Sequence, residues 1–257
     1  MKSSFDSANI SVLILAGQRE GEVDPLCAMA GVERKAMIPI CGRPMLEYPI
    51  EALKQAGLRT PFHVSGFRPN KYADLTEVPS GRGPADSTVT AIETGISYPV
   101  LVTTCDSALL SREMVDSFVS QAMDTGADFC AGLAEKRIIQ PAYPDVKRTY
   151  LNFKGSAVSG CNLFWVANEN GLEAIRFWKR AQNFRKQPIR LAAKVGIIPP
   201  LLYIFRQLTL DGAFRYAAKR LGITAKPVLI PIAEAAIDVD KPSDLELVEQ
   251  IMAGRAA

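Results

Sequence analysis

Histidine is almost absent from this sequence: His63 is the one histidine among 257 residues. A Ser/His/Asp triad would have to use that residue, and a zinc site built from several histidines is excluded. The five cysteines include no CxxC pair. An odd number of cysteines without that spacing fits a reducing compartment better than a disulfide framework.

Long apolar runs are also absent. No stretch of 18 apolar residues occurs, so no transmembrane helix is predicted. The first residues, MKSSFDSAN, are polar and lack the apolar core of a signal peptide. We therefore expect a cytoplasmic protein.

Charge is nearly balanced overall, at +3, but it is unevenly placed. Residues 173–226 carry twelve Lys or Arg and two acidic residues, which leaves a net charge of −7 on the remainder. Such a basic segment fits a phosphorylated substrate, an anionic membrane surface or an acidic partner, or it is a solvated helical face. Within it, residues 187–208 mix large apolar residues with cations, which indicates either peripheral membrane contact or ordinary core packing. The segment contains no recognisable nucleic-acid-binding module, so no nucleic acid is expected.

Short β-branched runs alternate with helical segments along the chain. This alternation predicts a three-layer α/β/α fold with a mostly parallel, Rossmann-like central sheet. We expect a single domain over residues 1–257, with a basic helical insertion at about 169–225. The expected strands cover residues 11–15, 61–65, 100–104, 128–133, 150–153, 162–166 and 227–231. The expected helices begin at Pro44, at Asp86 or Ser87, after Ser111 and at Pro242.

Candidate ligand-binding residues follow several of the expected strands, where open α/β sheets bind their ligands. Gly17 ends the first strand and allows a tight turn that exposes backbone N–H groups to phosphate or base. Lys35 lies in the long loop that follows. Asp106 ends the strand 100–104 and is either a Mg²⁺ ligand or a turn aspartate. Asp238 and Asp240 are two residues apart in an extended segment, so we expect them to point the same way.

These segments together carry a family resemblance. The stretches LAGQREG and ERKAMIPICGRPMLEYPIEAL resemble the opening of the MobA-like branch of the sugar-nucleotidyltransferase family, whose sheet is of the GT-A type. The family pattern is roughly L-A-G-G-x-G-x-R-M, followed by K-x-L-x-P-x-x-G-x-P-M-L. VLVTTCDSALLS resembles the strand that carries the family's metal-binding aspartate, and AIDVDKPSDLELV resembles its closing acidic motif. Here Gln18 replaces the second glycine, the following loop is longer, and Ala108 replaces a proline. The resemblance covers residues 10–168 and 226–252.

The resemblance implies roles for particular residues. The implied catalytic residues are Lys35, Asp106 and Arg19. Those implied to bind the nucleotide are Leu15, Ala16, Gly17, Gln18, Ser87 and Thr88, although Ser87 is equally explained as a helix cap. Mg²⁺, or Mn²⁺, would be held by Asp106 and Asp240, with Asp238 as a further candidate. The candidates for acceptor binding are Arg148, Thr149, Gly160 and Asn162.

The implied function is transfer of a nucleoside monophosphate from an NTP to a phosphorylated small molecule, with release of pyrophosphate. We favour CTP over GTP or UTP. One alternative is a GT-A-type glycosyltransferase that uses a nucleotide-sugar and a D-x-D metal motif. Another is a non-catalytic nucleotide-binding protein. Neither the acceptor nor the oligomeric state follows from the sequence.

Overall fold

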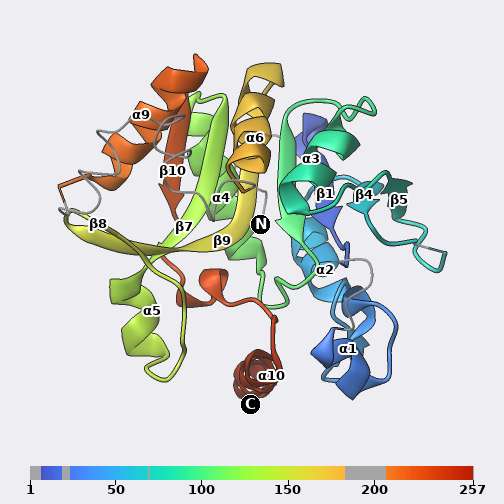
Figure 1. Ribbon diagram of the computed structural model, residues 1–257. Helices are drawn as coiled ribbons and strands as arrows, with labels where there is room; N and C mark the ends of the chain where they lie inside the picture. The colour runs from blue at the N-terminus through green and yellow to red at the C-terminus, as the bar shows by residue number, and fades with distance from the viewer. Residues whose placement is uncertain (1–6, 19–23, 69, 183–206, 257) are drawn as a thin grey trace.

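The computed structural model describes residues 7–18, 24–68, 70–182 and 207–256. Within these ranges eight strands form one central sheet (Figure 1). Seven of them lie in the order β10-β7-β9-β6-β1-β4-β5, and β8 pairs with β9 off this path. Their bounds are β1 (Ser11–Leu15), β4 (Phe62–Ser65), β5 (Leu75–Val78), β6 (Val100–Thr104), β7 (Phe129–Glu135), β8 (Leu151–Phe153), β9 (Ser156–Val166) and β10 (Ala225–Leu229).

Most of the pairings are parallel, as the strand-helix alternation predicts. β1 pairs in parallel with β4 and β6, β4 with β5, and β7 with β10. β9 breaks the pattern because it runs antiparallel to β6 and β7 and lies between them. The carboxyl ends of β1, β4 and β6 therefore meet at one edge of the sheet, where the loops that follow them can share a site.

Both faces of the sheet are covered by helices. On one face, Val12 and Ile14 of β1 belong to the same core as α2 (Glu47–Gln55) and α4 (Arg112–Thr125). On the other, Leu13 and Leu15 pack with α3 (Pro84–Ile92) and α6 (Glu169–Gln182). Alternate side chains of this strand thus point into different cores, which explains its continuous apolar sequence. The predicted three-layer α/β/α fold is confirmed.

Two predicted helix starts are wrong. Pro44 lies in the short strand β3 (Arg43–Pro44), which pairs with β2 (Pro39–Ile40), and the helix begins only at Glu47. The fixed φ of proline suits an extended segment as well as a helix start, so the sequence does not separate the two. The next helix begins at Pro84 rather than at Asp86 or Ser87. The predicted cap at Ser111 is confirmed, since its hydroxyl accepts a hydrogen bond from the Met114 amide.

Three strand or loop boundaries also differ from the prediction. β9 begins at Ser156 rather than at residue 162, because its first half consists of small residues with only one large apolar side chain, Val158. The last strand covers Ala225–Leu229 rather than 227–231. The long loop at 18–42 contains a capped helix, α1 (Pro25–Ala30), and a 3₁₀ turn at Lys35–Met37. The turn at Lys154 and Gly155 is confirmed, with φ +82° at the glycine.

Two further elements are not predicted by the sequence. They are β5, described above, and the short helix α5 (Lys136–Ala142), which interrupts the chain between β7 and β8. The C-terminal helix α10 (Pro242–Ala256) begins where predicted.

The basic insertion is described only in part. Its described ends form α6 and α9 (Leu210–Leu221), and α9 contacts β10. Residues 183–206 lie outside the described ranges, and so does most of the 187–208 segment proposed for membrane contact. Among the helices that the structure describes, none is both long enough and apolar enough to cross a bilayer.

His63 gives a first testable prediction. Burial lowers the pKa of its imidazole, whose Nδ1 is buried without a hydrogen-bond partner among the described residues. The folded protein therefore holds the ring neutral, and unfolding releases it to take up a proton near pH 6.5. We expect the free energy of unfolding to fall as pH decreases through that range, by at most about 1.4 kcal/mol per pH unit from this group.

Urea denaturation of the wild type and of His63→Gln at pH 7.5 and 5.5 measures this effect. The wild type should lose more stability than the variant between the two pH values. Equal losses would show that His63 does not contribute to the pH dependence.

Candidate active site

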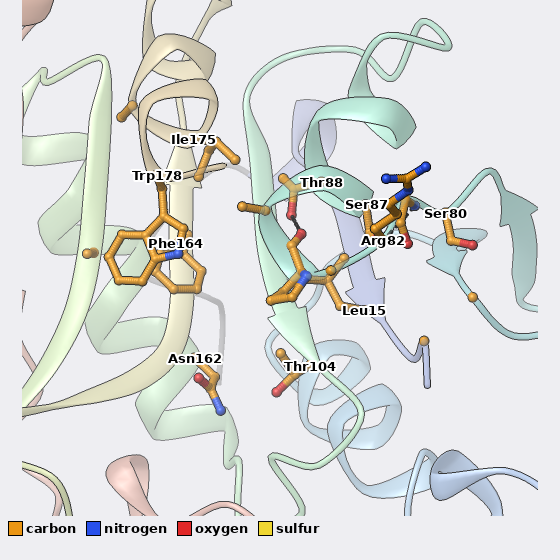
Figure 2. Close-up of a pocket in the computed structure, with 18 of the residues that line it drawn as sticks. Leu15, Ser80, Arg82, Ser87, Thr88, Thr104, Asn162, Phe164, Ile175 and Trp178 are labelled. Atoms are coloured by element: carbon orange, nitrogen blue, oxygen red, sulfur yellow. Dashed lines mark hydrogen bonds between the residues drawn. The ribbon is translucent and has the colours of Figure 1, made fainter. Parts of the chain in front are cut away.

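A cavity of ≈ 960 Å³ opens at the carboxyl ends of β1 and β6. Figure 2 shows part of its wall, with Leu15 and Thr104 at the strand ends and Ser87 and Thr88 on α3. Gly17, Gln18, Lys35, Asp106, Asn162, Asp238 and Asp240 also line it. The structure thus brings most of the predicted site residues to one hollow, although they come from distant parts of the chain.

The loop after β1 is fixed by hydrogen bonds to both neighbouring strands. The Cys105 amide donates to the carbonyl of Leu15, and the Ala16 amide donates to the carbonyl of Ser65. Gly17 then passes very close to Gly66, which follows β4. A Cβ atom on Gly66 would lie 2.3 Å from the Cα of Gly17, and the φ of Gly66 is +81°. Glycine at position 66 therefore allows the two loops to approach one another.

Lys35 joins the two proposed metal-binding segments. Its Nζ lies 2.8 Å from Oδ2 of Asp106 and 2.7 Å from Oδ1 of Asp240. The lysine and Asp106 side chains are 14% and 17% exposed, whereas that of Asp240 is 66% exposed. Residues 35, 106 and 240 therefore meet in space, as the sequence motifs predicted.

The charges of this cluster depend on one another. Burial lowers the pKa of the Lys35 ammonium, but the ion pairs with Asp106 and Asp240 outweigh it and raise that pKa above its ordinary value. Burial raises the pKa of the Asp106 carboxyl, and Lys35 opposes this rise, as does the hydroxyl of Thr104, which donates to Asp106. The pKa of the Asp106 carboxyl therefore stays above its ordinary value, and the charge of the nearby lysine limits the rise.

Asp238 takes different partners from Asp240. Its Oδ1 accepts a hydrogen bond of 2.6 Å from Nη1 of Arg148, and its Oδ2 accepts one of 3.0 Å from the side-chain amide of Asn162. Both oxygens of Asp238 are thus engaged by protein groups, although Asp238 and Asp240 both line the cavity. Asp244 lies in the first turn of α10, and its carboxylate accepts hydrogen bonds from the backbone amides of Asp240 and Lys241.

Ser87 and Thr88 lie in the first turn of α3, on the cavity wall. The Ser87 hydroxyl accepts a hydrogen bond from the Gly81 amide at 3.0 Å, and the Thr88 hydroxyl donates to the carbonyl of Pro84 at 2.8 Å. Asp86 similarly accepts from the Arg82 amide. These bonds hold the turn at residues 80–83 against the helix, so the turn presents a fixed surface to the cavity.

The other residues predicted to bind the acceptor are not among those that line the cavity. Thr149 is exposed, and Gly160 is exposed on β9 opposite Leu133. Arg148 reaches the site through Asp238, and its Nε is buried without a hydrogen-bond partner within the described ranges. Arg19 lies outside the residues that the structure describes.

Sequence reasoning missed four features of the site. Thr104 supports Asp106, and Gly66 makes room for Gly17. Gly66 directly follows a predicted strand and Thr104 ends one, so their positions in the sequence could have identified them. Arg34 and Arg82 line the cavity and add positive charge to its wall. The apolar side chains that line the rest of the cavity gave no motif at all.

The carboxylates of this cavity suit a magnesium ion that is also bound by a substrate. In the part of the chain described, no group of three or more His, Cys, Asp or Glu side chains is arranged to hold a metal. Asp106 and Asp240 nevertheless bring two carboxylates to one point, since both contact the same ammonium group. Mg²⁺ in proteins is commonly held by one or two carboxylates together with phosphate oxygens and water. The donor set therefore fits an ion that arrives with a nucleotide.

The fold and these loops define an α/β protein of the NTP-transferase class. Residues 13–155 match the model of the MobA-like NTP transferase domain, and the chain belongs to this family. No curated protein sequence matches the chain.

Solved structures share the fold. A hypothetical transferase from Thermus thermophilus is 29% identical, with a TM-score of 0.79 over 92% of this chain and 99% of that one. A CMP-2-keto-3-deoxy-manno-octonic acid synthetase in complex with CTP is 14% identical, with a TM-score of 0.57 over 96% and 100% of the two chains. A 2-C-methyl-D-erythritol 4-phosphate cytidylyltransferase, also from Thermus thermophilus, is 16% identical, with a TM-score of 0.53 over 95% and 99%.

Proposed function

We propose that the protein transfers a nucleoside monophosphate from an NTP to a phosphorylated small molecule and releases pyrophosphate. The observation that carries this proposal is the contact of Lys35 with both Asp106 and Asp240 in the large cavity. A cation and two carboxylates at the carboxyl edge of the sheet are suited to a triphosphate and its metal ion.

We propose CTP as the nucleotide. Two proteins of the same fold support this choice, one a cytidylyltransferase and the other solved in complex with CTP. In our proposal the base contacts the fixed turn at residues 80–83 with Ser87 and Thr88, and the phosphates lie along Gly17 and Gln18. Lys35, Arg34 and Arg82 all line the cavity and supply positive charge to it.

The acceptor phosphate is already anionic, so the reaction needs no histidine base. One of its oxygens attacks the α-phosphorus, the bond from that phosphorus to the bridging oxygen breaks, and pyrophosphate leaves. Catalysis then consists of positioning the two reactants and neutralising the charge that develops. Lys35 neutralises charge on the triphosphate, and Asn162, held by Asp238, orients the acceptor.

Asp106 and Asp240 would hold Mg²⁺ or Mn²⁺, which on binding supplies Lewis-acid polarisation of phosphate oxygens. The ammonium group of Lys35 occupies the position between the two carboxylates in this structure. It is therefore suited to move toward the phosphates when a cation and a nucleotide bind together. Membership of the NTP-transferase family favours this reaction over glycosyl transfer from a nucleotide-sugar.

A pyrophosphate-release assay tests the proposal. Each of CTP, GTP, UTP and ATP is incubated with Mg²⁺ and a panel of phosphorylated alcohols, sugars and polyols. We expect acceptor-dependent release that is fastest with CTP. Binding of NTPs without release under any condition would instead support a non-catalytic nucleotide-binding protein, and release with another base would correct the choice of CTP.

A further inference from the structure

The cavity extends well beyond the residues that the proposed transfer uses. Its second half lies between the sheet and the helices α6 and α9. Apart from Asn162, the side chains that line it from β7, β9, β10, α6 and α9 are apolar. The aromatic ones are Phe129, Phe164, Phe177, Trp178 and Phe214.

The change from polar to apolar wall occurs along a single strand. Asn162 and Phe164 are two residues apart on β9 and both line the cavity, although Asn162 adopts a left-handed φ of +51° where the pairing of β9 with β7 shifts register. Asn162 bonds to Asp238, whereas Phe164 stacks on Phe129 with ring centroids 6.3 Å apart. Figure 2 shows Asn162 near Thr104, with Phe164, Ile175 and Trp178 further along the same wall. The polar and apolar halves are therefore continuous.

The apolar wall is accessible to a ligand. Trp178 is 58% exposed although its side chain is large and apolar, and it lines the cavity. Phe164 and Phe214 are also only partly buried. Apolar side chains in a hollow that joins a catalytic centre usually contact the apolar part of a substrate. Of the surface that the described residues form, a nucleoside triphosphate and a small polar acceptor would not contact this part.

We propose that the acceptor is an amphiphile, whose phosphate lies near Asn162 and Lys35 and whose hydrocarbon chain lies in the apolar half of the cavity. This inference rests on the proposed function and names the acceptor class for the same site. The reaction is unchanged: the acceptor phosphate oxygen bonds to the α-phosphorus, and pyrophosphate leaves. The product is a nucleoside diphosphate joined to a hydrophobic chain.

The expected signature is a dependence of affinity on chain length. Each methylene that is buried should increase affinity about fourfold, until the apolar half is full. A short polar acceptor gains nothing from this wall. Alkyl monophosphates vary the chain while keeping the phosphate constant, so they are suitable probes.

Trp178 provides the readout, because the chain has two tryptophans and the other, Trp165, is buried on the opposite face of β9. Ethyl phosphate and dodecyl phosphate, the latter below its micelle concentration, are titrated into the protein while tryptophan fluorescence is recorded. We expect dodecyl phosphate to shift the emission to shorter wavelength and to bind at least about 100-fold more tightly than ethyl phosphate. Trp178→Phe should lose the signal and, by calorimetry, keep the affinity.

A charge placed in the apolar half tests its position. Ala217 on α9 is partly buried and lines the cavity, so we expect the Ala217→Glu variant to fold. Its affinity for dodecyl phosphate should be at least about tenfold lower, because the charge would be placed against the hydrocarbon chain. Lys219→Glu, which changes an exposed residue on the same helix, is the matched control and should bind like the wild type. Circular dichroism establishes that both variants fold.

Several results would overturn the inference. Equal affinity for the two alkyl phosphates would do so, as would equal binding of dodecyltrimethylammonium, because the phosphate would then not matter. If a second copy of the chain covers the wall, light scattering reports a dimer and dodecyl phosphate leaves the Trp178 emission unchanged. Turnover with short acceptors without chain-length dependence overturns this inference alone. Chain-length-dependent binding without pyrophosphate release from any NTP overturns the proposed function, and the acceptor role with it.

Discussion

Asp106→Asn is expected to lower the rate of pyrophosphate release about 10²- to 10³-fold, the usual effect of removing a central electrostatic group. The substitution keeps the shape of the side chain and removes its charge. Lys35 then keeps only Asp240 as its ionic partner, on the exposed side of the cluster. Because the chemistry depends on charge at this point, the loss should fall on kcat more than on KM. Lys35→Met should have an effect of the same order.

A second lysine–aspartate pair serves as the control. Lys54 and Asp74 form an ion pair on the surface, outside the cavity wall. Lys54→Met and Asp74→Asn should leave turnover within about twofold of the wild type, since exposed pairs contribute little. Unfolding in urea should show that all four variants remain folded. Turnover close to that of the wild type in Asp106→Asn or in Lys35→Met would refute the role of that residue.

Gly66→Ala is expected to destabilise the fold strongly, by about 3 kcal/mol or more. A Cβ atom there would lie 2.3 Å from the Cα and 2.7 Å from the backbone nitrogen of Gly17. Both atoms belong to backbone that is held by the strand ends, so neither can move as a flexible side chain would. The left-handed φ adds about 1–2 kcal/mol for a residue with a Cβ, and overpacking adds about 1–3 kcal/mol.

Gly155 separates the two contributions. Its φ of +82° is close to the +81° of Gly66, but a Cβ atom there would meet nothing within 4 Å. Gly155→Ala should therefore cost only the conformational part, about 1–2 kcal/mol. Urea denaturation of both variants measures the difference, which we assign to the approach of Gly66 to Gly17. If the two variants lose the same stability, the close approach of Gly66 to Gly17 does not add to the cost of the substitution.

The sequence predicted the parallel part of the sheet and the central residues of the site. Buried strands such as Ser11–Leu15 and Val100–Thr104 are mostly apolar runs, and Gly17 and Asp106 lie two residues beyond their ends. Because parallel strands align their carboxyl ends, the positions of these residues in the sequence are enough to predict that they lie close together. The family resemblance added Lys35 and Asp240, whose loops have no periodic pattern of their own.

Other parts of the site could not be predicted, because they depend on tertiary contacts. The partners of Asp238 are Arg148 and Asn162, which are 90 and 76 residues away in the chain. The spacing within residues 238–240 indicated a pair of similar carboxylates and did not indicate that the two would take different partners. The apolar wall is likewise assembled from single residues such as Phe129 and Trp178, each of which reads as ordinary core.

The place of β9 in the sheet constrains the order in which the chain can be completed. β6 and β7 are made before β9, yet in the finished sheet β9 lies between them and pairs with both. During synthesis, at about 5–20 residues per second, each presents an open edge for seconds until Ser156–Val166 emerges from the ribosome. The unpaired backbone groups of an open strand edge can form hydrogen bonds with strands of other chains. Ribosomes that stall between residues 135 and 156 should therefore release fragments prone to aggregation, whereas nascent chains that have passed residue 166 can close the gap.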